Sequence, residues 1–405
     1  MLQTPPLSLY VHFPWCVRKC PYCDFNSHAL QGEVPEAEYA AALLRDLEQD
    51  LPRVRGRPIA TVFFGGGTPS LFQPETIAAI LHGIRRHLML GPDAEITLEA
   101  NPGTVERGRF AGYRAAGVTR LSIGVQSFAS LHLQVLGRIH SAAEARHAAE
   151  QAHAAGLDNF NLDLMYGLPE QTLAQADADV QQAIALNPAH ISHYQLTLEP
   201  NTLFHAHPPK LPDEDLIWEM QKQCQARLAE AGYGHYEISA YARKGRQCRH
   251  NLNYWRYGDY LGIGAGAHGK LTDAGADRIS RLWKLKHPAA YLRVAGTETA
   301  IGGVKEIPEH ERSFEYMLNH LRLMESFNAA DFESATGLPF SQPQGTLERL
   351  RIRGLMQMTN GQWRPTELGY AYLNDLQAEF LPPRGGNTAH GPSSSHSHAA
   401  APDLD

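Results

Sequence analysis

The feature that most constrains the fold is a regular alternation of short apolar runs with longer amphipathic stretches between Leu7 and about Glu199. The apolar runs have the length and residue types of buried strands, and the stretches between them have helical periodicity. Strands that alternate with helices indicate βα units on a parallel sheet. The six runs are LSLYVHF (7–13), TVFFGG (61–66), EITLEAN (95–101), RLSIGVQS (120–127), NFNLDLMYG (159–167) and HISHYQLTLE (190–199).

The ends of these runs carry polar and sulfur-containing residues. A cysteine cluster follows the first run, GGGTP follows the second, and Asn101 closes the third. In βα barrels the functional groups lie at the carboxyl ends of the strands. We therefore predict an α/β fold, a complete or partial TIM-like (βα)6 barrel, with one site at its rim.

The composition is that of a soluble globular protein. The chain has 405 residues, 43% of them hydrophobic and 20% charged, and a net charge of −7. This charge argues against a nucleic-acid partner bound by bulk electrostatics. There is no apolar run of roughly 18 residues, the length that a membrane span needs, and the N-terminus does not read as a secretion signal. We expect a cytoplasmic protein without a membrane span, and leave peripheral membrane contact open.

The strand–helix rhythm changes after about residue 205. A helix followed by a turn at Asn360-Gly361 and another helix predicts a smaller, mostly helical, winged-helix-like C-terminal domain, which we expect to serve packing rather than nucleic-acid binding. The predicted divisions are a core domain with the cysteine cluster (1–240), a linking region that contains HNLNYW (241–305), the C-terminal domain (306–382) and a disordered tail (383–405).

The tail is rich in glycine, proline, serine and histidine and has no apolar periodicity. Its histidines, His390, His396 and His398, could bind a metal loosely. A solvated tail is the interpretation that this composition favours.

Three cysteines with C-x3-C-x2-C spacing, Cys16, Cys20 and Cys23, lie in the segment PWCVRKCPYCDF. Crowded cysteines of this kind indicate metal ligation in a reducing compartment. A zinc site would add His28 as a fourth ligand. A four-cysteine iron–sulfur cluster would add Cys224 or Cys248. In the third interpretation the three thiolates hold three irons of a [4Fe-4S] cluster and leave the fourth iron open to a small ligand.

The third arrangement resembles the radical S-adenosylmethionine (SAM) superfamily, in which SAM chelates the open iron and is cleaved to a 5′-deoxyadenosyl radical. The segment Gly65–Pro69 (GGGTP) supports this resemblance, because consecutive glycines let the backbone approach a charged ligand closely. In isolation a glycine triplet is equally consistent with a tight turn. After a strand and downstream of the cysteines, it is similar to the SAM-contacting glycine motif of the superfamily.

Several further motifs make the resemblance more specific. Together they are similar to the family of the oxygen-independent coproporphyrinogen III oxidases (HemN) and the related heme chaperones (HemW), from about Ser8 to Leu381. The motifs are YVHFPWCVRKCPYCDF, FFGGGTPS, LEANPGT, RLSIGVQSF, LGRIH and NLDLMYGLP.

The resemblance implies roles for individual residues. Tyr10 and Gly66 would line the SAM site, with Gly67 and Thr68 beside them. Tyr22, between two of the cysteines, would shield the cluster and face the adenosyl group.

The same resemblance assigns the polar wall of the site. Glu99 would receive the methionine ammonium or a ribose hydroxyl. Gln126, Arg138 and Asp163 would complete the adenosine pocket, and the planar fork of donors on Arg138 suits a carboxylate. Without the motifs, each of these four is more often a structural residue at a strand end.

Two departures distinguish the relatives. The oxidase motif has a fourth cysteine where this chain has Phe25, and only fifteen residues precede Cys16, which leaves no room for the oxidase's N-terminal extension. Both departures favour the chaperone branch. The alternative is an oxygen-independent coproporphyrinogen III oxidase that decarboxylates propionate side chains.

The segment HNLNYW (250–255) resembles the heme-binding element of the chaperones. An imidazole can ligate heme iron, and adjacent Tyr and Trp offer flat surfaces to a macrocycle. We therefore predict heme contact by His250, with His268 in GAGAHG as a second candidate. The structural alternative is a hydrogen-bonded loop histidine beside core aromatics. Cys248 is interpreted as a free thiol rather than a heme ligand or attachment point, and Cys224 as structural.

The predicted function is a heme chaperone that binds heme, transfers it to an unidentified acceptor protein, and carries a [4Fe-4S] cluster and SAM. No nucleic-acid partner is expected. The sequence leaves open whether SAM is cleaved, so enzymatic activity is undecided and no catalytic residue is assigned. It also leaves the oligomeric state open.

Overall fold

The computed structural model describes residues 1–103 and 108–382. Each of the six predicted runs forms a parallel strand, within a few residues of its expected bounds. The strands of the main sheet are β1 (Leu7–Phe13), β4 (Ile59–Gly66), β5 (Leu90–Ala100), β6 (Arg120–Gln126), β7 (Phe160–Tyr166), β8 (His190–Gln195), β9 (Gly234–Glu237), β10 (Ala240–Ala242), β11 (Asp259–Ile263), β12 (His268–Asp273), β13 (Arg278–Lys284) and β14 (Ile301–Glu306).

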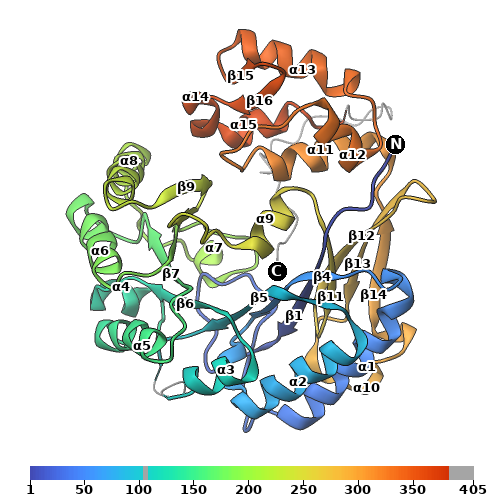
Figure 1. Ribbon diagram of the computed structural model, residues 1–405. Helices are drawn as coiled ribbons and strands as arrows, with labels where there is room; N and C mark the ends of the chain where they lie inside the picture. The colour runs from blue at the N-terminus through green and yellow to red at the C-terminus, as the bar shows by residue number, and fades with distance from the viewer. Residues whose placement is uncertain (104–107, 383–405) are drawn as a thin grey trace.

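The order of the strands confirms a partial barrel. The sheet runs β14-β13-β12-β11-β1-β4-β5-β6-β7-β8-β10-β9, and the neighbours from β1 to β8 are parallel. β11 lies on the other side of β1 and is also parallel to it, whereas β12, β13 and β14 add antiparallel strands. The helices follow the outside of this curved sheet (Figure 1).

The helices begin and end largely where the sequence indicates. The segment AAEARHAAEQAHA forms one helix, which starts with a capping box between Ser141 and Glu144 and is followed by Gly156 at φ +68°. The helices of the barrel part are α1 (Glu36–Val54), α2 (Pro74–His87), α3 (Phe110–Ala116), α4 (Ser130–Val135), α5 (Ala142–Ala154), α6 (Leu173–Ala185), α7 (Leu203–Ala206), α8 (Glu214–Glu230), α9 (Arg249–Trp255) and α10 (Pro288–Val294), with short 3-10 turns η1 (Pro69–Leu71) and η2 (Glu298–Ala300).

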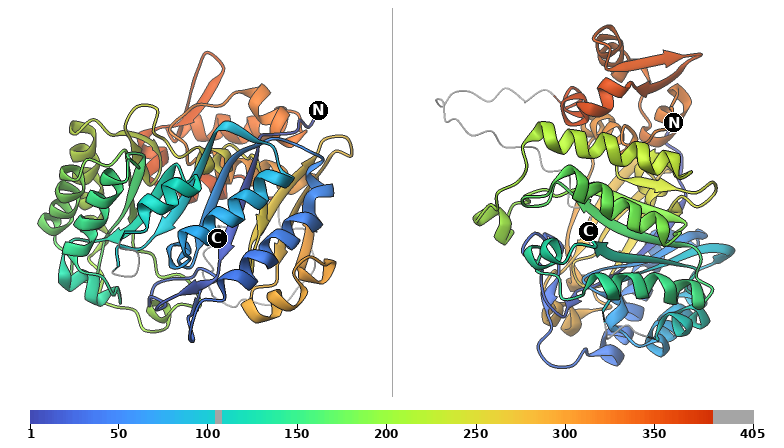
Figure 2. Two further views of the ribbon diagram at one scale, coloured as in Figure 1. Left: turned by 60° about the horizontal axis from the view of Figure 1, so that its bottom comes forward. Right: turned by 90° about the vertical axis from the view of Figure 1, so that its left-hand side faces the viewer.

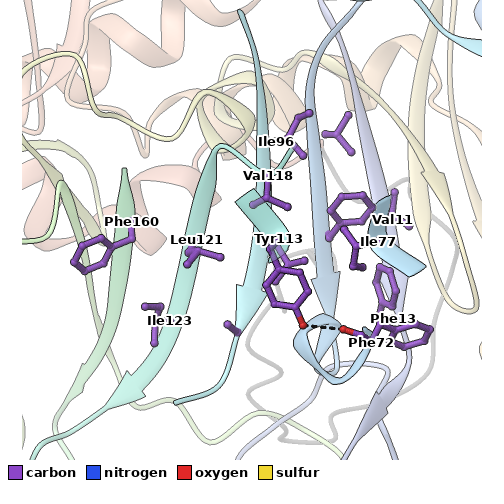
Figure 3. Packing of buried hydrophobic residues seen from close by; sticks show 14 of the residues in the cluster. Val11, Phe13, Phe72, Ile77, Ile96, Tyr113, Val118, Leu121, Ile123 and Phe160 are labelled. Carbon is purple, nitrogen blue, oxygen red and sulfur yellow. Dashed lines mark hydrogen bonds between the residues drawn. The ribbon is translucent and has the colours of Figure 1, made fainter. Parts of the chain in front are cut away.

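The main core lies between the parallel strands and these helices. Figure 3 shows strand residues such as Ile96 and Leu121 beside Ile77 of α2 and Tyr113 of α3. The Tyr113 hydroxyl donates to the Phe72 carbonyl at 2.7 Å, so the one polar atom of this buried ring is satisfied. The core therefore fixes the strands whose carboxyl ends form the rim.

A second core is formed mainly by the C-terminal part, with Leu2, Tyr257 and Ile279 from the rest of the chain, and the C-terminal part packs against α9 (Figures 1 and 2). Its two strands are joined at Asn360 and Gly361, both with positive φ, as a tight hairpin requires. This helix–hairpin–helix arrangement agrees with the predicted helical C-terminal domain. Its elements are α11 (Glu309–His320), α12 (Ala329–Thr336), α13 (Ser341–Ile352), β15 (Met356–Thr359), β16 (Gln362–Pro365), α14 (Glu367–Ala371) and α15 (Leu373–Ala378).

Residues 241–305, predicted as a linking region, contain β11, β12, β13 and all but the last residue of β14 of the main sheet. Their strands were not recognisable as core because charged residues are buried in them. Asp259 in β11 accepts hydrogen bonds from Lys270 at 3.1 Å and Arg57 at 2.7 Å, and it is fully buried. The predicted domain boundaries stay predictions, and the tail with its three histidines lies outside the described residues.

A buried ion network ties this extension to the barrel. Lys284 of β13 donates to Asp46 and Asp50 of α1, each at 2.6 Å, and all three side chains are fully buried. Asp46 also accepts from the Gly264 amide at 3.0 Å and the Tyr291 hydroxyl at 2.7 Å. Helix α1 thus fixes the positions of three segments relative to the barrel. These are the loop after β11, the strand β13 and the helix α10.

None of the helices in the described ranges has the length and apolarity required to cross a bilayer.

Buried histidines make the fold sensitive to acid. Burial lowers the pKa to about 4 in His12, His140 and His320, and to about 3 in His193 and His250. As the pH falls below 6.5, the unfolded chain therefore binds protons that the folded chain does not, and stability is lost. Each histidine contributes about 1.4 kcal/mol per pH unit.

We expect a net loss of at least ~3 kcal/mol between pH 6.5 and 5.5, measured by urea denaturation, after a partial offset from Asp179. Burial raises the pKa of Asp179 to about 6, so protonation of its carboxyl opposes the loss. His193→Phe should reduce the slope of stability against pH, because phenylalanine does not titrate. A phenylalanine ring can keep the stacking that His193 makes on Tyr166. The exposed His147→Phe serves as the control. A flat profile would contradict this account.

Candidate functional site

The three cysteines lie in a loop that starts where β1 ends. The short strands β2 (Trp15–Cys16) and β3 (His28–Ala29) pair with each other and close the base of this loop. Within it the Cys23 amide donates to the Cys20 carbonyl at 3.2 Å. The loop therefore places all three thiols at the carboxyl end of the barrel, as the sequence predicted.

Each of the three sulfurs has a hydrogen-bonding partner from a different part of the chain. The Thr68 hydroxyl donates to Cys16 Sγ at 3.5 Å, and Arg138 Nη1 donates to Cys20 Sγ at 3.8 Å. The Ser27 hydroxyl lies 3.8 Å from Cys23 Sγ. Donors of this kind stabilise metal-bound thiolates and tune iron–sulfur clusters. The surroundings of the thiols thus fit a cluster.

The alternative ligands lie elsewhere. Cys224 is buried in the main core. Cys248 lies at the start of α9, and its Sγ is 3.6 Å from Glu95 Oε1. His28 packs edge-on against His287. In the part of the chain that the structure describes, no three His, Cys, Asp or Glu side chains are arranged to hold a metal ion together.

A cavity of about 680 Å³ opens beside the cysteine loop. Most of the predicted site residues line it. They are Cys16, Cys20, Cys23, Tyr22, Gly66, Gly67, Thr68, Glu99, Gln126, Arg138 and Asp163. The strands β1, β4, β5, β6 and β7 bring these residues together although they are distant in the sequence. The ring of Tyr22 lies beside Phe204, with a centroid separation of 6.4 Å.

The glycine motif forms one wall of this cavity, and residues with side chains could not take the places of Gly66 and Gly67. Gly66 has φ +107°, and a Cβ atom there would lie 2.4 Å from the His12 ring. A Cβ atom on Gly67 would lie 2.5 Å from the Trp15 carbonyl oxygen. The Gly67 amide donates to the Phe13 carbonyl at 2.6 Å. The wall is therefore bare backbone, as close approach to a ligand requires.

Several carboxylates line the cavity, and two of them, Glu99 and Asp163, are hydrogen-bonded to groups on neighbouring strands. Glu99 accepts the Gly66 amide at 3.1 Å. Asp163 accepts from Asn161 at 2.7 Å and from the Ser122 hydroxyl at 3.2 Å. Burial raises the pKa of Asp163, opposed by these hydrogen bonds. Both carboxylates are thus held in place before any ligand arrives.

Arg138 is linked to the cluster loop through Asn101, which the sequence analysis placed at a strand end but did not assign to the site. Arg138 Nη2 donates to Asn101 Oδ1 and, at 2.7 Å, to the Gly124 carbonyl. Asn101 Nδ2 in turn donates to Thr68 Oγ1 at 2.9 Å. A chain of hydrogen bonds therefore runs from Cys20 through Arg138, Asn101 and Thr68 to Cys16.

Gln126 has a backbone conformation that is unusual for its residue type. It has φ +67°, at the point where β6 and β7 shift register. Its Oε1 accepts from the Tyr194 hydroxyl at 2.7 Å. Tyr194, on β8, also lines the cavity and was missed because a single tyrosine in a strand carries no site signal.

A second cavity of about 210 Å³ adjoins the first. Tyr10 and His250 line this second cavity and not the first, whereas the predicted residues Gly66 and Glu99 line both. His268, the second heme candidate, also lines it. Its remaining walls are mostly aromatic and include Phe63, Tyr254, Trp255 and Tyr260.

His250 presents one ring nitrogen without a partner in the described structure. Its Nδ1 lies 2.7 Å from Thr61 Oγ1, which donates its own proton to Ser8 Oγ at 2.8 Å. The Nδ1–H is therefore the donor to Thr61, and Nε2 keeps a free lone pair. Burial lowers the pKa of His250 to about 3, so the ring is neutral at pH 7. A neutral imidazole in this tautomer is suited to metal ligation.

Comparisons with known proteins agree with this site. Residues 10–183 match the Radical SAM superfamily and residues 307–372 match the HemN C-terminal domain. The solved structure of coproporphyrinogen III oxidase (HemN) from Escherichia coli has a TM-score of 0.78 at 23% identity, covering 93% of this chain and 90% of that one. The match to that structure shows the fold.

Fold, cysteine loop and glycine wall together define a radical SAM protein. The heme chaperone HemW of Escherichia coli is 50% identical over 94% of this chain and 100% of its own length, and that of Haemophilus influenzae is 50% identical over 94% and 99%. The chain belongs to the HemW family of heme chaperones. Bovine radical S-adenosyl methionine domain-containing protein 1, mitochondrial, is 35% identical over 92% of this chain and 87% of its own.

Proposed function

We propose that this protein binds heme and passes it to an acceptor protein, and that its large cavity holds a [4Fe-4S] cluster and SAM. The 50% identity with HemW chaperones over 94% of the chain supports the chaperone role. The radical SAM match supports the cluster and SAM. No motif in the sequence identifies the acceptor protein.

Cys16, Cys20 and Cys23 would hold the cluster. When bound, the cluster supplies an iron site for SAM and an electron that can cleave its sulfonium. Arg138, Thr68 and Ser27 would stabilise the thiolates through the contacts to their sulfurs.

SAM would lie along the bare glycine backbone, between the two carboxylates. Glu99 is placed to receive an ammonium group, and Asp163 and Gln126 to receive polar groups of the nucleoside. Tyr22 would cover the cluster on the side of the adenosyl group. These assignments use only residues that line the same cavity.

The free Nε2 of His250 is the observation that carries heme binding. It lies in an aromatic cavity that also includes Tyr254 and Trp255 of the HNLNYW segment. Flat aromatic walls and one neutral imidazole are the groups that a heme macrocycle and its iron require.

The second cavity must widen to admit a macrocycle. Its volume of about 210 Å³ is below the roughly 300–1,000 Å³ of typical ligand sites. One of its walls is α9, which packs against the C-terminal domain on its other side. Arg322 stacks over the Trp255 ring at 4.4 Å, and Arg256 pairs with both oxygens of Glu325 at 2.7 Å. A shift of this domain would release α9.

The test is a heme titration followed by absorption and electron paramagnetic resonance. Wild type should show histidine-ligated heme, and His250→Ala should lose this signature and bind heme at least ~10-fold more weakly. His268→Ala tests the second candidate in the same cavity, and the exposed His147→Ala is the control. Unchanged heme binding by His250→Ala would remove His250 from the site. Conversion of coproporphyrinogen to protoporphyrinogen would contradict the chaperone assignment.

A further inference from the structure

The two cavities share part of their walls. Phe25, Gly66 and Glu99 line both the cavity of about 680 Å³ and the cavity of about 210 Å³. Phe25 is 41% exposed, which places it at the mouth. The proposed SAM and heme sites are therefore neighbours separated by very little protein.

The partition is thin because Gly66 cannot carry a side chain. The His12 ring occupies the space behind it, 2.4 Å from the position of a Cβ atom. The His12 ring is itself fixed, with Nδ1 3.0 Å from the Tyr10 hydroxyl and Nε2 2.9 Å from the Asn26 carbonyl oxygen. The groups that line both cavities are the Gly66 backbone, the Glu99 carboxylate bonded to its amide, and Phe25.

Glu99 Oε2 accepts the Gly66 amide at 3.1 Å. This hydrogen bond holds the acid at the boundary, where one negative charge faces both cavities. Of the two carboxylates described above for the large cavity, Asp163 does not line the smaller one. Glu99 is therefore the charge that ligands on the two sides have in common.

We propose that Glu99 couples the two sites so that SAM and ferric heme weaken each other's binding. This inference rests on the proposed function. SAM brings a sulfonium, an ammonium and a carboxylate, and the ferric centre of heme, apart from its propionates, has one net positive charge. Glu99 can make its closest contact with only one of these cationic centres at a time, and the two centres repel each other at short range.

Coupling between two binding sites is reciprocal. If SAM lowers the affinity for ferric heme by some factor, heme lowers the affinity for SAM by the same factor. Couplings of this kind are typically about 5–150-fold, and we expect a factor of roughly 5–20 here. SAM binding would thereby promote release of heme towards the acceptor, with no need for SAM cleavage.

The test measures equilibrium binding on the cluster-loaded protein. Ferric heme is titrated without SAM and with saturating SAM, and the ratio of the two affinities is the coupling factor. Zinc protoporphyrin IX, whose metal centre adds no net charge, should give a ratio near one. S-adenosylhomocysteine, which lacks the sulfonium charge, should give an intermediate ratio.

The decisive variant is Glu99→Gln, which keeps an acceptor for the Gly66 amide and removes the charge. Its coupling factor should fall several-fold, towards one, even where its SAM affinity is lower, because the ratio is taken at saturation. Glu144→Gln is the matched control. Glu144 lines only the large cavity, and glutamine preserves its capping box.

Three outcomes are distinguishable. A wild-type ratio of one for ferric heme overturns the coupling and leaves the chaperone function standing. A wild-type effect that Glu99→Gln leaves unchanged overturns the role of Glu99. Absence of histidine-ligated heme in wild type refutes the proposed function, and the coupling with it.

Discussion

Replacing Cys20 with alanine is expected to abolish the iron–sulfur cluster and, with it, SAM binding. Three sulfurs from one short loop are the complete protein ligand set in the proposed site, so removing one leaves the cube with two protein ligands. Cys20 Sγ also accepts a hydrogen bond from the Arg138 guanidinium, which would lose this acceptor in the variant. We expect the iron content after anaerobic reconstitution to fall at least ~10-fold, together with the visible absorption of the cluster.

The control for this variant is Cys224→Ala, which removes a buried thiol from the main core and leaves the loop intact. It should load iron as wild type does, although the core loses a small side chain. A Cys20→Ala protein with full iron content and SAM-sensitive electron paramagnetic resonance would show that the cluster is held differently.

Asp46→Ala is expected to destabilise the fold by about 3–5 kcal/mol, because it leaves a buried ammonium short of a partner. Asp46 joins Lys284, Tyr291 and the Gly264 amide, so the change also leaves two neutral donors unsatisfied. Total stability of a domain is about 5–15 kcal/mol, so this is a large fraction. Urea denaturation measures the loss.

Glu48→Ala on the same helix is the matched control, since Glu48 is 55% exposed and pairs only at the surface with His87. If Asp46→Ala yields no folded protein, the double variant with Lys284→Met tests the same idea. Replacing buried ions by apolar groups is often neutral, so the double variant should recover part of the stability, while Asp50 loses Lys284 and keeps Arg53 at 3.1 Å. A loss below about 1 kcal/mol in Asp46→Ala would contradict the role of the network.

The parallel strands were predictable because short stretches rich in apolar and β-branched residues alternate with helical stretches, and most side chains of these strands are buried. The antiparallel extension was not. Its strands hide Asp259, Lys270 and Lys284, whose burial depends on partners in distant elements. A local pattern cannot show that a lysine in one strand meets two aspartates of a helix more than 200 residues earlier.

At the site, motifs predicted which residues line the large cavity, because strand ends of a parallel sheet meet at one edge. They did not predict that Tyr10 and His250 would face a separate cavity. That division depends on where α9 packs and on the His12 ring behind Gly66, both of which are tertiary. Asn101 and Tyr194 were missed as site residues for the same reason.

The parallel pairing of β1 with β11 also has a consequence for how the protein is made. Leu7 pairs with Asp259 and Val11 with Ile263, so one edge of β1 stays uncovered until two thirds of the chain has left the ribosome. The cysteine loop also completes its contacts late, because Asn26 Nδ2 donates hydrogen bonds to the carbonyls of Ala265 and Lys286. At roughly 5–20 residues per second this interval lasts tens of seconds. During it, the hydrogen bonds that hold the cysteine loop against the segments after β11 and β13 cannot form.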